Sequence, residues 1–404
     1  MIADDDENDE LLFLCLIFAA AVWYNSLRNR SRLTRSAILE ARLSPWNRLL
    51  QYGDDGSFLG LTGFTRDAFN NLKIVIFGEN DNRVGRVGRP SSLDRNGELG
   101  LYLFYVGSQM KTKHLCLIFG VVPTTATVSI YKVMRRICRI LKTHPASRVI
   151  FPDDNQMRVF ADIIQIREPM VNNVIGFVDG LSLAVQCSDD IVQQNAAYNG
   201  YSHDTCCTNV FAFSPFGKII YSAYNYPGSW HDSTVAQDLI NLVISKIGVY
   251  AMCVDQGFPR SGDLHGRFVG PMSKKMKKRL SPELAEYLLP LHERYISLRQ
   301  ASEWGMRALQ GTFSRLKSRM TSSSESRKKI IFSIILLHNF RTEFVGLNQI
   351  ATVFNPHYDQ YSNLDTYDRI QRYFALSKRI EKMLKFILRF NHPLFHFDMT
   401  HYCC

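Results

Sequence analysis

The chain has 404 residues, of which 46% are apolar, 12% aromatic and 21% charged. This is the composition of a globular protein of two or three domains, and it excludes a chain that is disordered along its length. The formal net charge of +11 predicts an acidic partner, and nucleic acid is the commonest partner of that kind.

Residues 1–80 are predicted to form a helical N-terminal region. The apolar run 11–24 has fourteen residues, which is too short to span a membrane, and it follows an acidic stretch instead of the basic one of a signal peptide. We therefore expect a buried helix there, with a signal anchor as the alternative. The Gly/Arg-rich segment 79–95 reads as a linker that ends in a helix N-cap signal at Pro90-Ser91-Ser92.

Residues 81–148 are predicted to form a DNA-binding domain of three helices, of which the third begins at the turn "GVVPTT". This helix has one apolar face and an opposite basic face, and Thr124 or Thr125 is expected to cap it. Such a helix after a tight turn is typical of a helix-turn-helix, whose second helix meets DNA phosphates and base edges. An ordinary three-helix bundle with a solvated basic face is the alternative. The basic residues are Lys132, Arg135, Arg136 and Arg139.

From residue 149 to residue 345 the pattern changes to short β-rich runs separated by turns, followed by helices. The order strand, strand, hairpin, helix, strand, helices predicts an α/β fold with a mixed sheet flanked by helices. A helical tail, 346–404, completes the chain. The predicted strands are 173–180, 183–187, a hairpin over 208–229 that turns at Pro215-Phe216-Gly217, and 248–257, with a helix at 233–246 and a basic loop at 274–279.

Three aspartates stand at predicted strand ends or just after one. Asp179 closes "VIGFVD", Asp255 closes "YAMCVD", and Asp232 enters the helix that follows the hairpin. Each one alone fits a turn or a helix cap. All three together place acids next to buried strands, where desolvation is costly unless the acids pair or bind a cation. Clustered carboxylates favour Mg²⁺ or Mn²⁺, and two such ions promote in-line phosphoryl transfer, so the set predicts a nuclease or strand-transfer enzyme.

A fourth acid, Glu303, opens the segment 299–320, which is predicted to be one amphipathic helix. On a helix of 3.6 residues per turn, Glu303 and Gln310 share a polar face beside an apolar stripe that should pack on the sheet. Glu303 could therefore point toward the aspartates; a surface charge favoured by the helix dipole is the alternative. The polar face also carries Arg307 and Lys317, placed to meet phosphates, and the apolar stripe consists of Met306, Leu309, Phe313, Leu316 and Met320.

The chain resembles the nuclease of the PIF/Harbinger class of DNA transposons, in the DDE superfamily, which includes domesticated Harbinger-derived relatives. The resemblance covers about residues 90–345. It rests on "VIGFVDG", on "YNGYSHDTCCTNVFAFSPFGKIIYSAYNYPGSWHDS", on "CVDQGFP", "LQGTFSRLKSRM" and "ILLHNF", and on the order in which these stretches occur.

This resemblance implies an RNase H-like fold and DNA cleavage and joining that depend on two divalent ions, Mg²⁺ or Mn²⁺. It carries metal-binding and catalytic roles to Asp179, Asp232 and Asp255. Which of Asp232 and Asp255 is the second aspartate of the pair stays open. The chain departs from the family at the third acid, because the usual glutamate position holds Gln310; we favour Glu303, two turns upstream, as the third carboxylate.

The sequence thus predicts a transposase-type endonuclease that cleaves and joins double-stranded DNA at transposon ends. An inactive, domesticated DNA-binding protein is the main alternative, and a hydrolase of small phosphoesters is disfavoured by the long basic N-terminal arm. His231 is expected to orient a phosphate or to be a packed loop histidine, and the resemblance places Tyr198 and Asn199 near the site. The loop lysines, which contact phosphate or form a nuclear localisation signal, are Lys274, Lys275, Lys277 and Lys278.

The resemblance also implies a Myb-like DNA-binding partner protein and a homo-oligomer on DNA. Nine cysteines without a CxxC pair are typical of reduced thiols in an intracellular protein. We expect the protein in the nucleus, with the cytoplasm as the alternative, and we expect no membrane partner.

Overall fold

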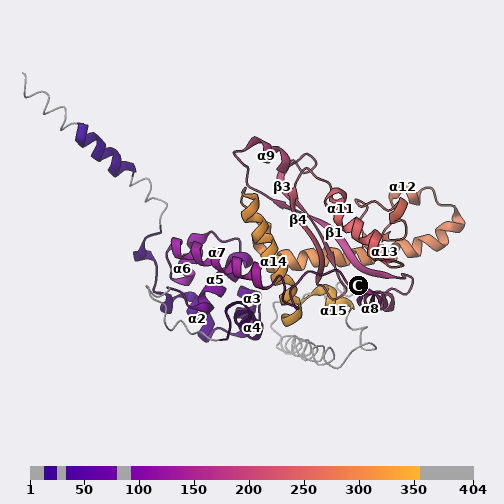
Figure 1. The fold of residues 1–404 in the computed structure, drawn as a ribbon, viewed down its shortest axis with the longest axis horizontal. Helices are drawn as coiled ribbons and strands as arrows, with labels where there is room; N and C mark the ends of the chain where they lie inside the picture. Colours follow the sequence, from indigo (N-terminus) through magenta and orange to yellow (C-terminus); the bar gives the residue numbers. More distant parts are fainter. Residues whose placement is uncertain (1–12, 25–32, 80–91, 355–404) are drawn as a thin grey trace, which may run out of the picture.

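The computed structural model of the protein describes residues 13–24, 33–79 and 92–354 (Figure 1). Most of the predicted linker 79–95 and most of the predicted tail 346–404 lie outside these residues. The apolar run near the N-terminus is a helix, Phe13–Tyr24, as predicted. The prediction that it is buried is wrong, because its large side chains are exposed, for example Phe18 at 73% and Trp23 at 67%.

The described N-terminal residues also form a compact group of helices around an aromatic core. Trp46 stacks on Phe119 with ring centroids 5.1 Å apart and also contacts Phe58 and Phe69. Helices from the predicted regions 1–80 and 81–148 therefore share one core. These helices are α2 (Pro45–Tyr52), α3 (Asp55–Thr62), α4 (Arg66–Phe77), α5 (Arg95–Gly107), α6 (Thr112–Phe119) and α7 (Pro123–Ile140).

The three helices predicted for 81–148 are confirmed as α5, α6 and α7, and their caps differ from the prediction. Asp94, not Ser92, caps α5, because its Oδ1 accepts a hydrogen bond of 2.7 Å from the Gly97 amide. Helix α7 begins at Pro123 without a side-chain cap, since proline presets the helical φ and has no N–H to satisfy.

Helices α6 and α7 meet at an angle of 97°, within the range of a helix-turn-helix pair. Among the described helices no single one is long and apolar enough to cross a membrane; this bent pair alone meets the test of length and composition.

A mixed sheet follows, in the spatial order β4-β3-β1-β5-β6, with the two-residue β2 paired to the start of β3. Strands β5 and β6 run parallel to β1, whereas β3 is antiparallel to both β1 and β4. This strand order, a three-stranded meander extended by two parallel strands, is that of the RNase H-like fold. The strands are β1 (Val174–Ala184), β2 (Tyr198–Asn199), β3 (Asp204–Phe213), β4 (Ile219–Pro227), β5 (Ala251–Val254) and β6 (Phe268–Val269).

The predicted hairpin with its turn at Pro215-Phe216-Gly217 is confirmed as β3 and β4. The two strands predicted at 173–180 and 183–187 are one strand, β1. The prediction that Asp179 ends a strand is therefore wrong: Asp179 lies within β1 and pairs with Phe211 of β3. Neighbouring β3, which continues past this point, supplies the backbone partners that extend β1.

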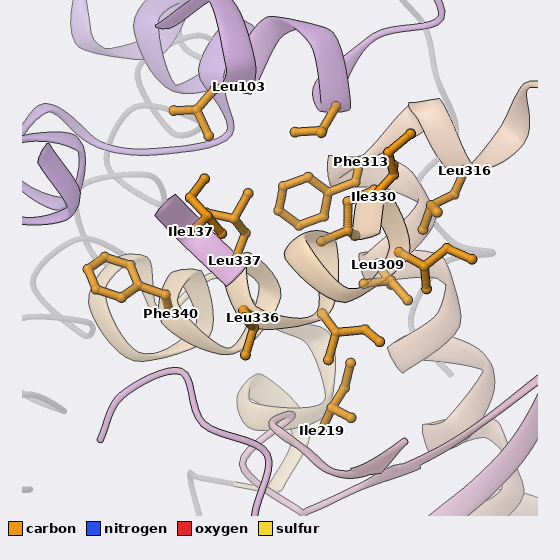
Figure 2. Packing of buried hydrophobic residues seen from close by; sticks show 14 of the residues in the cluster. Leu103, Ile137, Ile219, Leu309, Phe313, Leu316, Ile330, Leu336, Leu337 and Phe340 are labelled. Atoms are coloured by element: carbon orange, nitrogen blue, oxygen red, sulfur yellow. The ribbon is translucent and has the colours of Figure 1, made fainter. Parts of the chain in front are cut away.

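Both faces of the sheet are covered by helices. On one face, Ile175 and Val178 of β1 join a core with α11; on the other, Phe177 joins a core with α13 and α14. Figure 2 shows side chains of the second core, among them Leu309, Phe313, and Leu336 and Leu337 of α14. The covering helices are α8 (Asp154–Arg167), α10 (Asp232–Val235), α11 (Gln237–Lys246), α13 (Pro282–Thr312), α14 (Ser324–Val345) and α15 (Gln349–Phe354), and two short helices are α9 (Ile191–Ala197) and α12 (Lys274–Lys277).

Helix α14 lies between the N-terminal helices and the sheet (Figure 1), where it contacts both α7 and β4. The helix predicted to run through residue 320 ends earlier, at Thr312. A 3-10 turn, Ser314–Lys317, follows, and Met320 forms a β-bridge with Val185. All five residues of the predicted apolar stripe are nevertheless buried. The predicted basic loop contains the single helical turn α12.

Candidate active site

Asp179 lies on β1, and Asp255 directly follows the neighbouring parallel strand β5. Val178 of β1 is in register with Val254 of β5, so the residue after each of them is an aspartate at the same level of the sheet. Strands in a sheet are about 4.8 Å apart. Side chains alternate along a strand, and Phe177 and Cys253 belong to the core under α13. Both aspartates therefore project toward α13.

Asp232 approaches the same point from the loop after β4, as the first residue of α10. A Cβ on Gly180 would come within 2.2 Å of the Asp232 carboxylate, so only glycine leaves room for it there. Gly180 is paired with Val210, a residue of the core under α11. Asp232 therefore touches β1 next to Asp179 but from the opposite face of the sheet.

Helix α13 brings Glu303 and two further polar residues to the aspartates. The Oγ of Ser302 donates a hydrogen bond of 3.4 Å to Oδ2 of Asp179. The Nε of Arg299 lies 3.1 Å from Oδ1 of Asp255, and the NH2 nitrogen of the same guanidinium lies 3.2 Å from Oε1 of Glu303. Arg299 therefore connects the acid of the helix to an acid of the sheet.

Two contacts, one on each side of this group, fix where α13 crosses the sheet. On one side, the buried Glu168, which directly follows α8, accepts a 2.9 Å hydrogen bond from Ser297. On the other, Gly305 lies so close to Phe213 that an added Cβ would come within 2.8 Å of the ring. The turn that carries Ser302 and Glu303 lies between these two points.

The register of α13 separates the two candidates for the third acid. Helix α13 is continuous from Glu303 to Gln310, and seven residues correspond to about 10 Å along a helix. Glu303 shares Arg299 with Asp255, whereas Gln310 lies two turns further along. The structure thus places Asp232 and Asp255 next to Asp179 and links Glu303 to Asp255 through Arg299, whereas Gln310 lies two helical turns beyond Glu303.

Burial and neighbouring negative charges raise the pKa values of two of the aspartates. The pKa of Asp179 is raised to about 6, first by burial and further by the charges of Asp255 and Asp232, while the Gly180 amide and Arg299 oppose the rise. Burial also raises the pKa of Asp232, an effect that the charge of His231 opposes and that of Asp255 strengthens. Like charges in a partly buried site are the environment that a bound cation would stabilise.

Three other residues predicted from the sequence to lie near the site are exposed or support a neighbouring loop. His231 is exposed and directly precedes α10. Asn199 supports the loop between β4 and α10, since its side-chain amide donates a 2.8 Å hydrogen bond to the Gly228 carbonyl. Tyr198 is 45% exposed.

The predicted basic face of α7 is only partly available to DNA. Lys132 forms a 2.6 Å ion pair with the buried Glu98, and Arg136 lies over the Phe77 ring at 5.2 Å. Arg135 and Arg139 are exposed. Two of the four predicted DNA-facing residues on this helix therefore have partners within the protein, and the DNA-binding role of all four stays a prediction. The other predicted contact residues are exposed: Lys274, Lys275, Lys277, Lys278, Arg307 and Lys317.

Sequence reasoning missed Arg299, Ser302 and Gly180. Arg299 stands four residues before Glu303, a spacing that places two side chains on one face of a helix, so its pairing with Glu303 could be predicted from the sequence. The contact with Asp255 was not, because it depends on how α13 crosses the sheet.

The oxygen-rich donor set suits a hard divalent cation, and such an ion would offset the unfavourable charge of Asp179 and Asp232. Within residues 13–24, 33–79 and 92–354, however, no three His, Cys, Asp or Glu side chains converge closely enough to hold a metal ion as they stand. Asp255 lies instead against Arg299. The residues fit a metal ion by chemistry, and ligation requires their side chains to turn.

Similarity to known proteins includes one solved structure and one protein family. The crystal structure of a pre-cleavage Mos1 transpososome is similar at 13% sequence identity over 68% of this chain and 81% of that chain, with a TM-score of 0.24. No curated protein matches the chain. Residues 178–339, which include all four acids, match the model of a family described as DDE superfamily endonuclease, and endonucleases of this kind generally use divalent metal ions. Residues 178–339 are thus similar to the DDE superfamily endonucleases.

Proposed function

We propose that this protein is a DNA endonuclease and transposase of the PIF/Harbinger type, dependent on Mg²⁺ or Mn²⁺. The observation that carries the proposal is the position of Asp179, Asp255 and Glu303 between α13 and the face of the sheet that it covers, inside the region that matches the endonuclease family. Two parallel strands and one helix supply these acids, so they are far apart in sequence and adjacent in space.

In this proposal Asp179, Asp255 and Glu303 hold two divalent ions. Asp255 is the second aspartate of the pair, supported by the shared face and register of Asp179 and Asp255. Asp232, which reaches the site from the opposite face, is an auxiliary acid that adds negative charge beside Gly180. Mg²⁺ or Mn²⁺ held by these acids would supply activation of the attacking water or DNA 3′-hydroxyl and charge stabilisation of the leaving oxygen.

Ser302 holds Asp179 by its hydrogen bond, and the exposed Arg307 and Lys317 flank the site as contacts for DNA phosphates. We assign further phosphate contacts to Arg135 and Arg139 of α7 and to the lysines of α12. The substrate is double-stranded DNA at transposon ends. A Myb-like partner protein, a homo-oligomer on DNA and a nuclear location complete the proposal, and these rest on the resemblance and on the charge.

The test is cleavage of supercoiled plasmid carrying the terminal repeats that flank the gene, with Mn²⁺ or Mg²⁺ and with the partner protein supplied. Wild type is expected to nick or cut the plasmid only with metal. Asp179→Asn, Asp255→Asn and Glu303→Gln are each expected to lose about 10²-fold or more of the rate, the scale of removing one electrostatic group from a catalytic site. Gln310→Ala is the matched control on the same helix, with a rate near that of wild type.

Full activity of Glu303→Gln, or loss of activity in Gln310→Ala, would overturn the assignment of the third acid. A second function, DNA binding without cleavage, is favoured by one observation, the glutamine at the position where the resembling family usually has glutamate. It predicts tight binding of the same plasmid ends and no metal-dependent cut by wild type.

A further inference from the structure

We propose that Arg299 is an internal counter-cation of the acidic site: its guanidinium takes the place of a divalent ion between Asp255 and Glu303 and must leave both acids when the ion binds. This inference rests on the proposed function, because it concerns the same acids. It assigns to Arg299 a role in setting the affinity for the metal.

The first support is the placement of the guanidinium. One nitrogen lies 3.1 Å from Asp255 and another 3.2 Å from Glu303, so a single positive group bridges an acid on the sheet and an acid on the helix. These two residues are also proposed to share a metal ion. One position between them cannot hold both a guanidinium and a divalent cation.

The second support is the quality of the contacts. Arginine usually binds a carboxylate through paired, well-aligned hydrogen bonds. Here the Nε of Arg299 is buried and finds no aligned hydrogen-bond acceptor among the described residues, although Asp255 is within 3.1 Å. The contacts are therefore ionic and poorly directed, which makes them easier to exchange for a metal ion than a bidentate pair would be.

The third support is access. The side chains of Arg299, Asp255 and Glu303 are 37%, 39% and 40% exposed. A hydrated ion can reach the acids, and the guanidinium, on a flexible stem, can turn outward into solvent. Ion pairs this exposed contribute about 0–1 kcal/mol each, so breaking two of them lowers the affinity for a metal without preventing its binding.

The same pairs explain why the acids do not converge. In the described part of the chain no three acidic, histidine or cysteine side chains are placed to hold an ion, and the two acids that contact Arg299 are members of the predicted ligand set. With the guanidinium removed, Asp255 and Glu303 lose their present partner and are free to turn toward Asp179.

The experiment measures the affinity for Mn²⁺ alone, from the free Mn²⁺ signal in electron paramagnetic resonance, with full-length protein and without DNA. Arg299→Gln is expected to bind Mn²⁺ about tenfold more tightly than wild type, since two weak ion pairs and one repelling charge disappear. Arg299→Lys keeps the charge and is expected to stay near wild type. Lys246→Gln, which removes an exposed charge from the end of α11 on the opposite face of the sheet, is the control and is expected to change the affinity by less than about twofold.

Unchanged or weaker binding by Arg299→Gln, with its circular dichroism and melting temperature near those of wild type, would overturn the inference and make Arg299 a structural contact. Should Arg299→Gln fail to fold, Arg299→Met is tested under the same criterion, and failure of both to fold also assigns Arg299 a structural role. Asp179→Asn separates the two levels: equal Mn²⁺ binding by wild type and Asp179→Asn would sink the proposed metal site and this inference together. Loss in Asp179→Asn with no gain in Arg299→Gln would sink the inference alone.

Discussion

The ionised form of Asp179 destabilises the metal-free folded protein. Its pKa is about 6 in the folded protein against an ordinary value of 3.8, mainly because it is partly buried. Between these two values the folded chain holds a proton that the unfolded chain has released. The free energy of unfolding therefore decreases as pH rises from about 4 to about 6, and the destabilisation is complete above that window.

Replacing this charge is expected to stabilise the metal-free protein. Asp179→Asn should raise the free energy of unfolding at pH 7.5 by about 1–3 kcal/mol, because the amide has no charge to desolvate. At pH 4 the difference from wild type should almost vanish, since Asp179 is then protonated in the folded state. Chemical unfolding at the two pH values measures both numbers, and a variant that is less stable than wild type at pH 7.5 would refute this account of Asp179.

Residue types and spacing were enough to identify all four acids of the candidate site, because an aspartate after an apolar run is visible in the chain itself. They were not enough to choose between Glu303 and Gln310, which share a helical face. The choice depends on where α13 crosses β1, which is set by contacts such as Glu168 with Ser297 and Gly305 with Phe213. No local pattern records those contacts.

At the scale of the elements, α13 depends on a close approach to the sheet. An added Cβ at Gly305 would lie 2.8 Å from the Phe213 ring, whereas one at Gly311 of the same helix would meet nothing within 4 Å. Gly305→Ala is expected to push α13 outward and to lower stability by about 1–3 kcal/mol, the usual cost of overpacking. It should also weaken Mn²⁺ binding, because Glu303 moves with the helix.

Gly311→Ala is the matched control. Alanine in an open helical position is expected to raise stability by about 0.5–1 kcal/mol, with Mn²⁺ affinity unchanged. Thermal melts and Mn²⁺ titrations of both variants make the comparison. Equal behaviour of the two variants would mean that the contact between Gly305 and Phe213 does not position α13.

Elements with strong local signals were predicted well, and elements shaped by distant partners were not. The hairpin β3–β4 and the helices α5 to α7 have turn residues and periodicity of their own. Strand β1 extends past Asp179 because β3 pairs with it. The regular helix α13 ends at Thr312. Met320, which the apolar periodicity assigned to the same helix, instead forms a β-bridge with Val185.

For the whole molecule, the net charge of +11 predicts a nucleic-acid partner but not the surface that binds it. On α7 the fold pairs Lys132 with Glu98 and leaves Arg135 and Arg139 exposed. Arg135→Ala and Arg139→Ala should each weaken DNA binding and reduce the slope of log affinity against log salt by about 1. Lys132→Met should leave that slope unchanged and lower stability by about 1–3 kcal/mol, because Glu98 stays buried without its partner.

Fluorescence anisotropy of a labelled duplex across a salt series measures these slopes, and chemical unfolding measures the stability of the lysine variant. A slope that falls for Lys132→Met and not for Arg135→Ala would contradict the assignment of the exposed face of α7 to DNA.

The central claim is that Asp179, Asp255 and Glu303 form one metal site, and a crystal structure of the wild-type protein with Mn²⁺, read in the anomalous difference map, tests it most directly. We predict manganese within about 2–2.5 Å of carboxylate oxygens of Asp179 and Asp255, Glu303 turned toward the ion, and the Arg299 guanidinium away from both of its present partners. Saturating Mn²⁺ with no anomalous peak between these acids, and with Arg299 still between Asp255 and Glu303, would contradict it.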